Sequence, residues 1–136
     1  MFILALIKKR IMYEIEISNE TQSFLKSLEK APQTKFNRAF DKVKLGIVKE
    51  DYFKKLSGTD GLWEFRVQDN KKWFRILAFL CRYEGDNFTT IVTTHGFEKK
   101  GNKTPPKEIE KAEKQKNDQS VTVNKRNSVK PKKGKT

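Results

Sequence analysis

The segment Leu62–Phe97 constrains the fold most, because its pattern is typical of three consecutive antiparallel strands. Its first part, Leu62–Val67, alternates between large apolar and polar side chains, as a strand with one buried face does. Its second part, Trp73–Tyr83, is almost wholly apolar, which is typical of a strand covered on both faces. A polar turn rich in Asp, Asn and Lys separates the two parts. The pattern therefore predicts a hairpin whose second strand is buried on both sides.

The register of this hairpin follows from the burial of its apolar side chains. If Asp69–Lys72 form a four-residue loop, Val67 pairs with Phe74 and the large apolar side chains share one face. The same register places Arg66 directly opposite Arg75 on the other face. Like charges directly across a ladder destabilise it. We therefore expect an anion to neutralise the two arginines.

The chain before this hairpin predicts helices that pack on the sheet. Tyr13–Ile17 alternates as a short, half-buried strand does. Asn19 has the position of a helix N-cap, with Gln22 at the spacing of a capping box, and Pro32 suits the first turn of a second helix. The apolar positions of the second helix follow the i, i+3/i+4 rule: Phe36, Ala39, Phe40, Val43 and Ile47. This order predicts an α+β fold, with a helical hairpin packed on one face of an antiparallel sheet.

One more helix is predicted after the last strand. Thr104 has the position of its N-cap and Pro105 that of its first residue. Ile109 and Ala112 are its only apolar anchors. Because an isolated helix gains little stability without an apolar face, we expect this helix to be weakly docked, or mobile until a partner covers it.

Both ends of the chain are expected to lie outside the folded domain, which we place at residues 12–116. Residues 1–11 hold an apolar run of about six residues, far short of the roughly 20 that span a bilayer, and their cations follow the run, unlike those of a signal peptide. We interpret them either as an additional N-terminal strand or helix, or as an over-called start with Met12 as the true first residue. Residues 117–136 are polar and basic without periodicity, which predicts a disordered tail.

The net charge of +13 over 136 residues indicates an anionic partner. Residues 1–11 contribute +3 and residues 117–136 contribute +5, which leaves +5 for residues 12–116. This excess favours nucleic acid over a membrane surface as the partner. The single cysteine, Cys81, excludes an intramolecular disulfide and fits a reducing compartment, so we expect a cytoplasmic protein. No Gly-rich phosphate loop or clustered ligand spacing indicates a nucleotide or metal cofactor.

Two runs of sequence carry a resemblance to a known family. The first is KKLSGTDGLWEFRVQDNKKWFRILAFL, with a lysine–leucine–glycine turn, the motif LWE.R and an arginine early in the next strand. The second is TTHGFEKKGNKTPPKEIEKAEK, with the pattern HGF.KK..KTP..EI..A. In their order and spacing they resemble the phage-derived Gp49-like, HigB-type branch of the RelE/ParE toxin superfamily. The resemblance covers residues 12–116, and the family's order of strands and helices is the one predicted above.

The resemblance implies the toxin of a type II toxin–antitoxin system. Such a toxin is a small ribonuclease that cuts mRNA, usually on the ribosome, and is silenced by a cognate helix-turn-helix antitoxin of the HigA type. The reaction is attack of a ribose 2′-hydroxyl on the adjacent phosphodiester, which needs a base, cations and an acid but no metal. Two alternatives stay open: a non-catalytic, ParE-type inhibitor of DNA gyrase, and a nucleic-acid-binding module without catalysis.

The residues that match the family's site are basic or aromatic. The resemblance implies a catalytic set of Arg66, Arg75, His95 and Lys55, and an RNA-binding set of Lys54, Phe97, Lys99, Lys100 and Lys103. Guanidinium groups suit two-point contact with phosphate. Each assignment has a structural alternative: ion pairing of the arginines with Glu64, solvated lysines, a structural histidine, and packing of Phe97 against the second helix.

The base of the reaction is the least determined role. No tyrosine follows Tyr83, so the C-terminal tyrosine that several ribosome-dependent relatives use as a base is absent. His95 is the one histidine, and its unperturbed pKa of about 6.5 suits acid or base work. Either His95 or a lysine must therefore serve as the base, or activity is weak.

Overall fold

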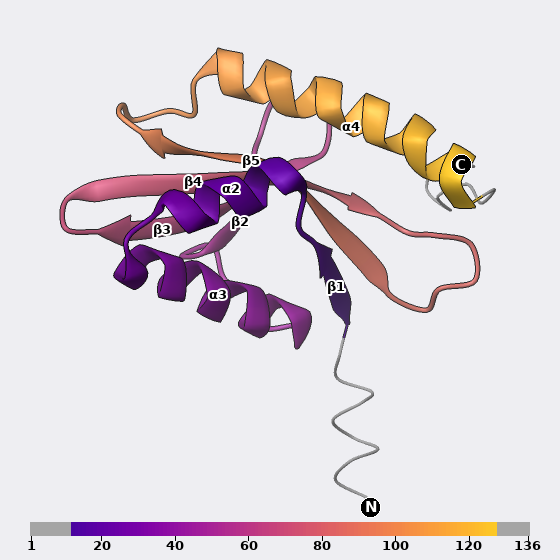
Figure 1. The fold of residues 1–136 in the computed structure, drawn as a ribbon, viewed down its shortest axis with the longest axis horizontal. Coiled ribbons are helices and arrows are strands. Elements are labelled where there is room, and N and C mark those ends of the chain that lie inside the picture. The colour runs from indigo at the N-terminus through magenta and orange to yellow at the C-terminus, as the bar shows by residue number, and fades with distance from the viewer. Residues whose placement is uncertain (1–11, 128–136) are drawn as a thin grey trace, which may run out of the picture.

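The computed structural model describes residues 12–127, with side chains described up to Asp118, so the expectations for residues 1–11 and 128–136 lie outside the described chain. The elements are β1 (Tyr13–Glu16), α2 (Asn19–Ser27), α3 (Lys30–Lys44), β2 (Phe53–Lys55), β3 (Leu62–Asp69), β4 (Lys72–Cys81), β5 (Thr89–Lys99) and α4 (Pro106–Asn127). The strands form one sheet in the order β1-β5-β4-β3-β2, in which β1 is parallel to β5 and the other pairs are antiparallel. Figure 1 shows α2 and α3 on one face of this sheet and α4 across the other. The predicted α+β fold is confirmed.

The central hairpin has the predicted register. Val67 pairs with Phe74 and Arg66 with Arg75 in the β3–β4 ladder. The ladder continues to Asp69 and Lys72, so the expected four-residue loop is a turn of two residues, Asn70 and Lys71. Both have positive φ, 50° and 68°, as the tight turn of a two-residue hairpin requires.

Strand β4 is covered on both faces, as its apolar sequence predicts. The larger core lies under α2 and α3: Leu25, Phe36, Ala39, Phe40, Val43, Phe53, Phe65, Val67, Phe74, Ile76, Ala78 and Ile91. The smaller core lies under α4: Leu62, Leu77, Phe79, Cys81, Val92 and Ala112. The alternation of β3 sends Phe65 and Val67 into the first core and Leu62 into the second, which leaves Glu64 and Arg66 on the α4 face.

Two predicted helix starts are displaced by one residue. The N-cap of α2 is Ser18, whose Oγ accepts a hydrogen bond from the backbone N–H of Thr21 at 3.1 Å, and Asn19 is already helical. Helix α4 begins at Pro106, and the carbonyl of Pro105 accepts the first backbone hydrogen bonds. The hydroxyl of Thr104, the predicted cap, instead donates a hydrogen bond of 3.0 Å to the carboxylate of Glu64. A side chain of the sheet, Glu64, thus binds the hydroxyl that the sequence assigned to the cap of α4.

One strand and the length of one helix differ from the prediction. Strand β2 extends the sheet beyond β3, in a stretch where the sequence indicates only a connection. Helix α4 continues past residue 117, where we expected the ordered chain to end, to Asn127. None of the helices in the described part of the chain has the length and hydropathy of a membrane-spanning segment.

Candidate functional site

The ladder register gathers polar side chains from four strands on the α4 face of the sheet. Lys54 of β2 pairs with Glu64 of β3, and Arg66 of β3 pairs with Arg75 of β4. Trp73 of β4 pairs with Lys99 of β5. Residues directly opposite each other on paired strands project to the same face. This alternation therefore aligns one row of charged side chains across the sheet.

These residues line a continuous groove. Two hollows of about 300 and 410 Å³ share Arg66, Lys99 and Asn102, so they join into one depression. We call it the basic groove. Its cationic lining residues are Lys54, Lys55, Arg66, Arg75, Lys99, Lys100 and Lys103, and Glu64 is the one carboxylate among the residues that line it.

Glu64 lies between the two arginines. Its Oε1 is 3.6 Å from Nε of Arg75, and its Oε2 is 3.6 Å from Nε of Arg66. Both distances are too long for hydrogen bonds, and both buried Nε atoms have no hydrogen-bond partner among the described residues. Backbone carbonyls bind the outer nitrogens. Nη1 of Arg66 donates a hydrogen bond of 3.1 Å to the carbonyl of Glu50, and Nη1 of Arg75 donates one of 2.9 Å to the carbonyl of Phe74. Both guanidinium groups are thus held in place, and the Nε of each still has an unused hydrogen-bond donor among the described residues.

Burial and mutual repulsion perturb two cations of the groove. Burial lowers the pKa of Arg75, which is 2% exposed; the Glu64 carboxylate opposes this shift and Arg66 adds to it. Burial also lowers the pKa of Lys99, as does the charge of Arg75. A phosphate bound there would relieve this repulsion, because it would supply the missing negative charge.

His95 lies outside the basic groove. It is 2% exposed, and it sits beneath α4 with Nε2 at 2.8 Å from Oε1 of Glu108 and Nδ1 at 3.1 Å from Oγ1 of Thr94. Burial lowers its pKa, and the hydrogen bond with Glu108 opposes that shift. The geometry supports the structural alternative for this histidine, because both ring nitrogens already have partners.

Phe97 is also absent from the residues that line the groove. Its ring lies 5.8 Å from that of His95, and it packs against the smaller core under α4. The predicted packing against the second helix is wrong, because that helix, α3, lies on the opposite face. The register of β4 and β5 shifts between Leu77, which pairs with His95, and Ala78, which pairs with Thr93. A β-bulge of this kind cannot be seen in a pattern of alternation.

The lysines differ in how they approach the groove. Lys55 borders it at the end of β2, but its ladder partner is Trp63, which packs on the α2/α3 core. Lys54, one residue earlier, has the ladder position of the groove face. Lys100 is bound to Glu98 at 3.0 Å, an exposed pair, and Lys103 follows in the loop before α4.

Sequence reasoning missed two residues of the groove. Trp73 is 44% exposed beside Arg75 and Lys99, where an aromatic face is open to a ligand. Glu64 was considered only as a partner that would neutralise the arginines. The signal for both was present, because each lies two residues before a groove arginine and alternation places such pairs on one face.

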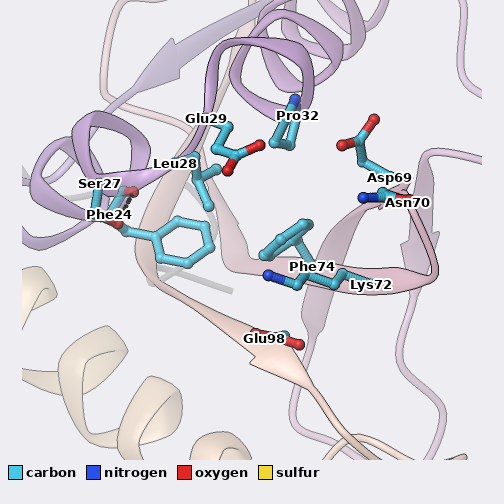
Figure 2. Close-up of a pocket in the computed structure, with 10 residues that line it drawn as sticks. All are labelled: Phe24, Ser27, Leu28, Glu29, Pro32, Asp69, Asn70, Lys72, Phe74 and Glu98. Atoms are coloured by element: carbon cyan, nitrogen blue, oxygen red, sulfur yellow. Dashed lines mark hydrogen bonds between the residues drawn. The ribbon is translucent and has the colours of Figure 1, made fainter.

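A third hollow, of about 380 Å³, lies on the α2/α3 face and has the opposite character. Figure 2 shows Phe24 and Phe74 within it, with the acidic side chains of Glu29, Asp69 and Glu98 around them. Lys72 also lines this hollow, but three carboxylates outnumber it, so the hollow does not suit a nucleic-acid backbone. The hollows lined mainly by cations are those on the α4 face.

The fold and the basic groove define a small α+β protein with a cationic groove on one face of its sheet. The family model "Phage derived protein Gp49-like (DUF891)" matches residues 23–117, so the chain belongs to this family, which confirms the resemblance noted in the sequence. The structure is similar to that of a mutant of the E. coli toxin RelE in the free state, with a TM-score of 0.55 and 12% sequence identity over 76% of this chain and 97% of that chain. This likeness shows that the fold is RelE-like. No curated protein sequence matches the chain at a significant level.

Proposed function

We propose that this protein is the toxin of a type II toxin–antitoxin system and a metal-independent endoribonuclease that cleaves mRNA on the ribosome. The observation that carries the proposal is the basic groove, where seven cationic residues and one carboxylate line a single depression. Membership of the Gp49-like family and the RelE-like fold support the toxin class. The cytoplasm, where mRNA is translated, is the expected compartment.

In this proposal Arg66 and Arg75 hold the scissile phosphate. Their ladder pairing keeps two guanidinium groups side by side, and only the carboxylate of Glu64 lies between them. A phosphorane accumulates negative charge on its equatorial oxygens, so cations already in place stabilise it without reorganisation. Lys54 and Lys99 extend the positive surface along the RNA backbone on either side.

Trp73, instead of Phe97 from the predicted RNA-binding set, is the aromatic residue that stacks on an RNA base in this proposal. An exposed aromatic face beside a phosphate site stacks unpaired bases, worth about 1–3 kcal/mol per base. The partner of the toxin would be a HigA-like helix-turn-helix antitoxin, because an unrestrained toxin would arrest its host.

The test is cleavage of mRNA in a translating extract, with the sites mapped by primer extension and EDTA added in one arm at a concentration that leaves ribosomes intact. The parent protein is expected to cut, and Arg66→Ala/Arg75→Ala to lose at least 100-fold in rate. Because Arg75 is buried, Arg66→Ala/Lys99→Ala is a second variant that keeps the Arg75–Glu64 pair. Circular dichroism checks that both are folded.

Arg38→Ala on α3 is the matched control, since it removes one exposed arginine from the opposite face. A folded groove variant that cuts as fast as the parent would contradict the phosphate role of the arginines. Inhibition of gyrase supercoiling without RNA cleavage by the parent would instead establish the ParE-type alternative.

A further inference from the structure

The one carboxylate that lines the basic groove lies where a proton acceptor is needed. We propose that Glu64 is the general base that takes the proton from the attacking 2′-hydroxyl. This inference rests on the proposed ribonuclease function and adds to it a residue that the sequence offered only as a counter-ion. Glu64 is 3% exposed, so an edge of the carboxylate, not the whole side chain, would meet the substrate.

The position of Glu64 follows from the sheet. It precedes Arg66 by two residues on β3, so both side chains project to the α4 face. The ion pairs of Glu64 with Arg66 and Arg75 place its carboxylate next to the proposed phosphate-binding site. The nucleophile is the 2′-hydroxyl on the ribose that carries the scissile phosphate. A base beside the two phosphate-binding arginines is therefore beside the nucleophile as well.

The two oxygens of Glu64 are not equivalent. Oε1 accepts a hydrogen bond of 3.0 Å from the hydroxyl of Thr104, and this bond fixes the rotation of the carboxylate. Oε2 accepts no hydrogen bond from any described residue, and its contact with Nε of Arg66 is 3.6 Å long. An ionised carboxylate is an acceptor only, with lone pairs to spare on each oxygen. Oε2 is thus the atom available to a substrate hydroxyl.

Oε2 of Glu64 takes the 2′-hydroxyl proton as the O2′–P bond forms, and the P–O5′ bond breaks as the 5′-oxygen receives a proton from a groove lysine. The products are a 2′,3′-cyclic phosphate and a 5′-hydroxyl end. The protonated Glu64 and the neutral lysine then exchange their proton through solvent, which restores the groove.

The other candidates for the base fit less well. A lysine is protonated near neutral pH and has no lone pair to accept a proton. Lys99 is better suited to donate, because burial and the charge of Arg75 lower its pKa and make its proton easier to lose. His95 is sealed beneath α4 with both ring nitrogens engaged.

The decisive experiment measures kcat and KM for cleavage of a defined mRNA on purified ribosome complexes, for the parent and for Glu64→Gln. Gln keeps the shape of Glu but cannot accept a proton. General-base catalysis contributes about 10²–10⁴-fold, so we expect a fall in kcat of at least 100-fold, with KM within threefold.

Two results would overturn the inference. One is a folded Glu64→Gln protein within threefold of the parent rate. The other is a variant whose loss lies in KM with kcat unchanged, because that is the behaviour of a residue that only positions Arg66 and Arg75 for binding. A parent protein that cuts no RNA would instead refute the proposed function, so the two failures are distinguishable.

Thr104→Val tests the same claim without touching the carboxylate. The hydrogen bond from Thr104 fixes the rotation of the carboxylate, so its loss should lower kcat more than it raises KM, whereas Thr104→Ser keeps the hydroxyl and should restore most of the rate. An unchanged kcat in Thr104→Val would contradict the assignment. The charged groups that face Glu64 stay the same in this variant: Lys54 from β2, Arg66 from β3, Arg75 from β4 and Lys99 from β5.

Discussion

The two faces of the sheet are built differently. On the α2/α3 face, aromatic rings pack directly on one another: Phe65 lies 4.4 Å from Phe53 and 4.8 Å from Phe40, centroid to centroid. On the α4 face, Ala112 and Ile109 are the apolar contacts that the helix supplies to a smaller core. Much of the remaining contact is polar. One face therefore has the packing of a stable core, and the other leaves room for charge.

The polar contacts of α4 are numerous but individually weak. Lys111 is bonded to Glu20, and Lys116 is paired with Asp60 at 3.5 Å. Such solvent-exposed pairs contribute about 0–1 kcal/mol each. The aromatic core under α2 and α3 can therefore hold the sheet while the opposite face keeps a buried arginine, Arg75, that costs stability. This division predicts that substitutions on the two faces will have separable effects.

The largest expected effect is on the stability of the aromatic face. Phe65 is fully buried, and its replacement by Ala leaves a cavity, which costs about 3–5 kcal/mol in the free energy of unfolding. Urea denaturation measures the change. Phe97→Ala, on the α4 face, is the matched control and should cost less than half as much, because Phe97 is only partly buried. Equal losses would contradict the claim that stability resides mainly on the α2/α3 face.

The sequence predicts the groove arginines because two strong constraints agree. Burial of Val67 and Phe74 on one face leaves a single register, and that register forces Arg66 opposite Arg75. The lysines of the loop after β5 follow from their place in the chain. Period-two alternation thus carries information about function as well as about the core.

Other features depend on contacts that no local pattern contains. Gly96 illustrates this, because a Cβ at that position would lie 2.2 Å from Cδ2 of Phe24 on α2. The glycine of the HGF motif is therefore needed for the approach of α2 to β5, which a reading of the motif as catalytic does not suggest. The buried state of His95 has a similar origin, since it depends on where α4 lies. Strand β2 is only three residues long, too short for alternation to be visible.

An intermediate effect distinguishes two neighbouring lysines. Lys54 has the ladder position of the groove face, whereas Lys55 is paired with Trp63 of the opposite face. Loss of one charged hydrogen bond to phosphate costs about 1.5 kcal/mol, or roughly tenfold in kcat/KM. We expect Lys54→Ala to lower the rate of mRNA cleavage by about that factor and Lys55→Ala to change it less than threefold. The reverse order would show that β2 presents its other face to RNA.

The smallest effect tests whether α4 is held in place through His95. Burial lowers the pKa of this histidine, although Glu108 and Glu20 oppose the shift and Lys111 adds to it. The unfolded chain, with a histidine pKa of about 6.5, therefore binds a proton as the pH falls while the folded chain does not. The contribution to stability is complete above about pH 6.5 and is lost as the pH falls toward the lowered pKa of the folded state.

His95→Gln removes this proton-linked component. Urea midpoints measured from pH 7.5 to 5 should fall more steeply for the parent than for the variant, because glutamine does not titrate. Carboxylates away from His95 contribute equally to both proteins, so the difference between the two slopes reports His95 together with the carboxylates that interact with it, Glu108 and Glu20. Parallel slopes would mean that α4 leaves His95 open to water, and a histidine open in that way would again be available to a substrate in the neighbouring groove.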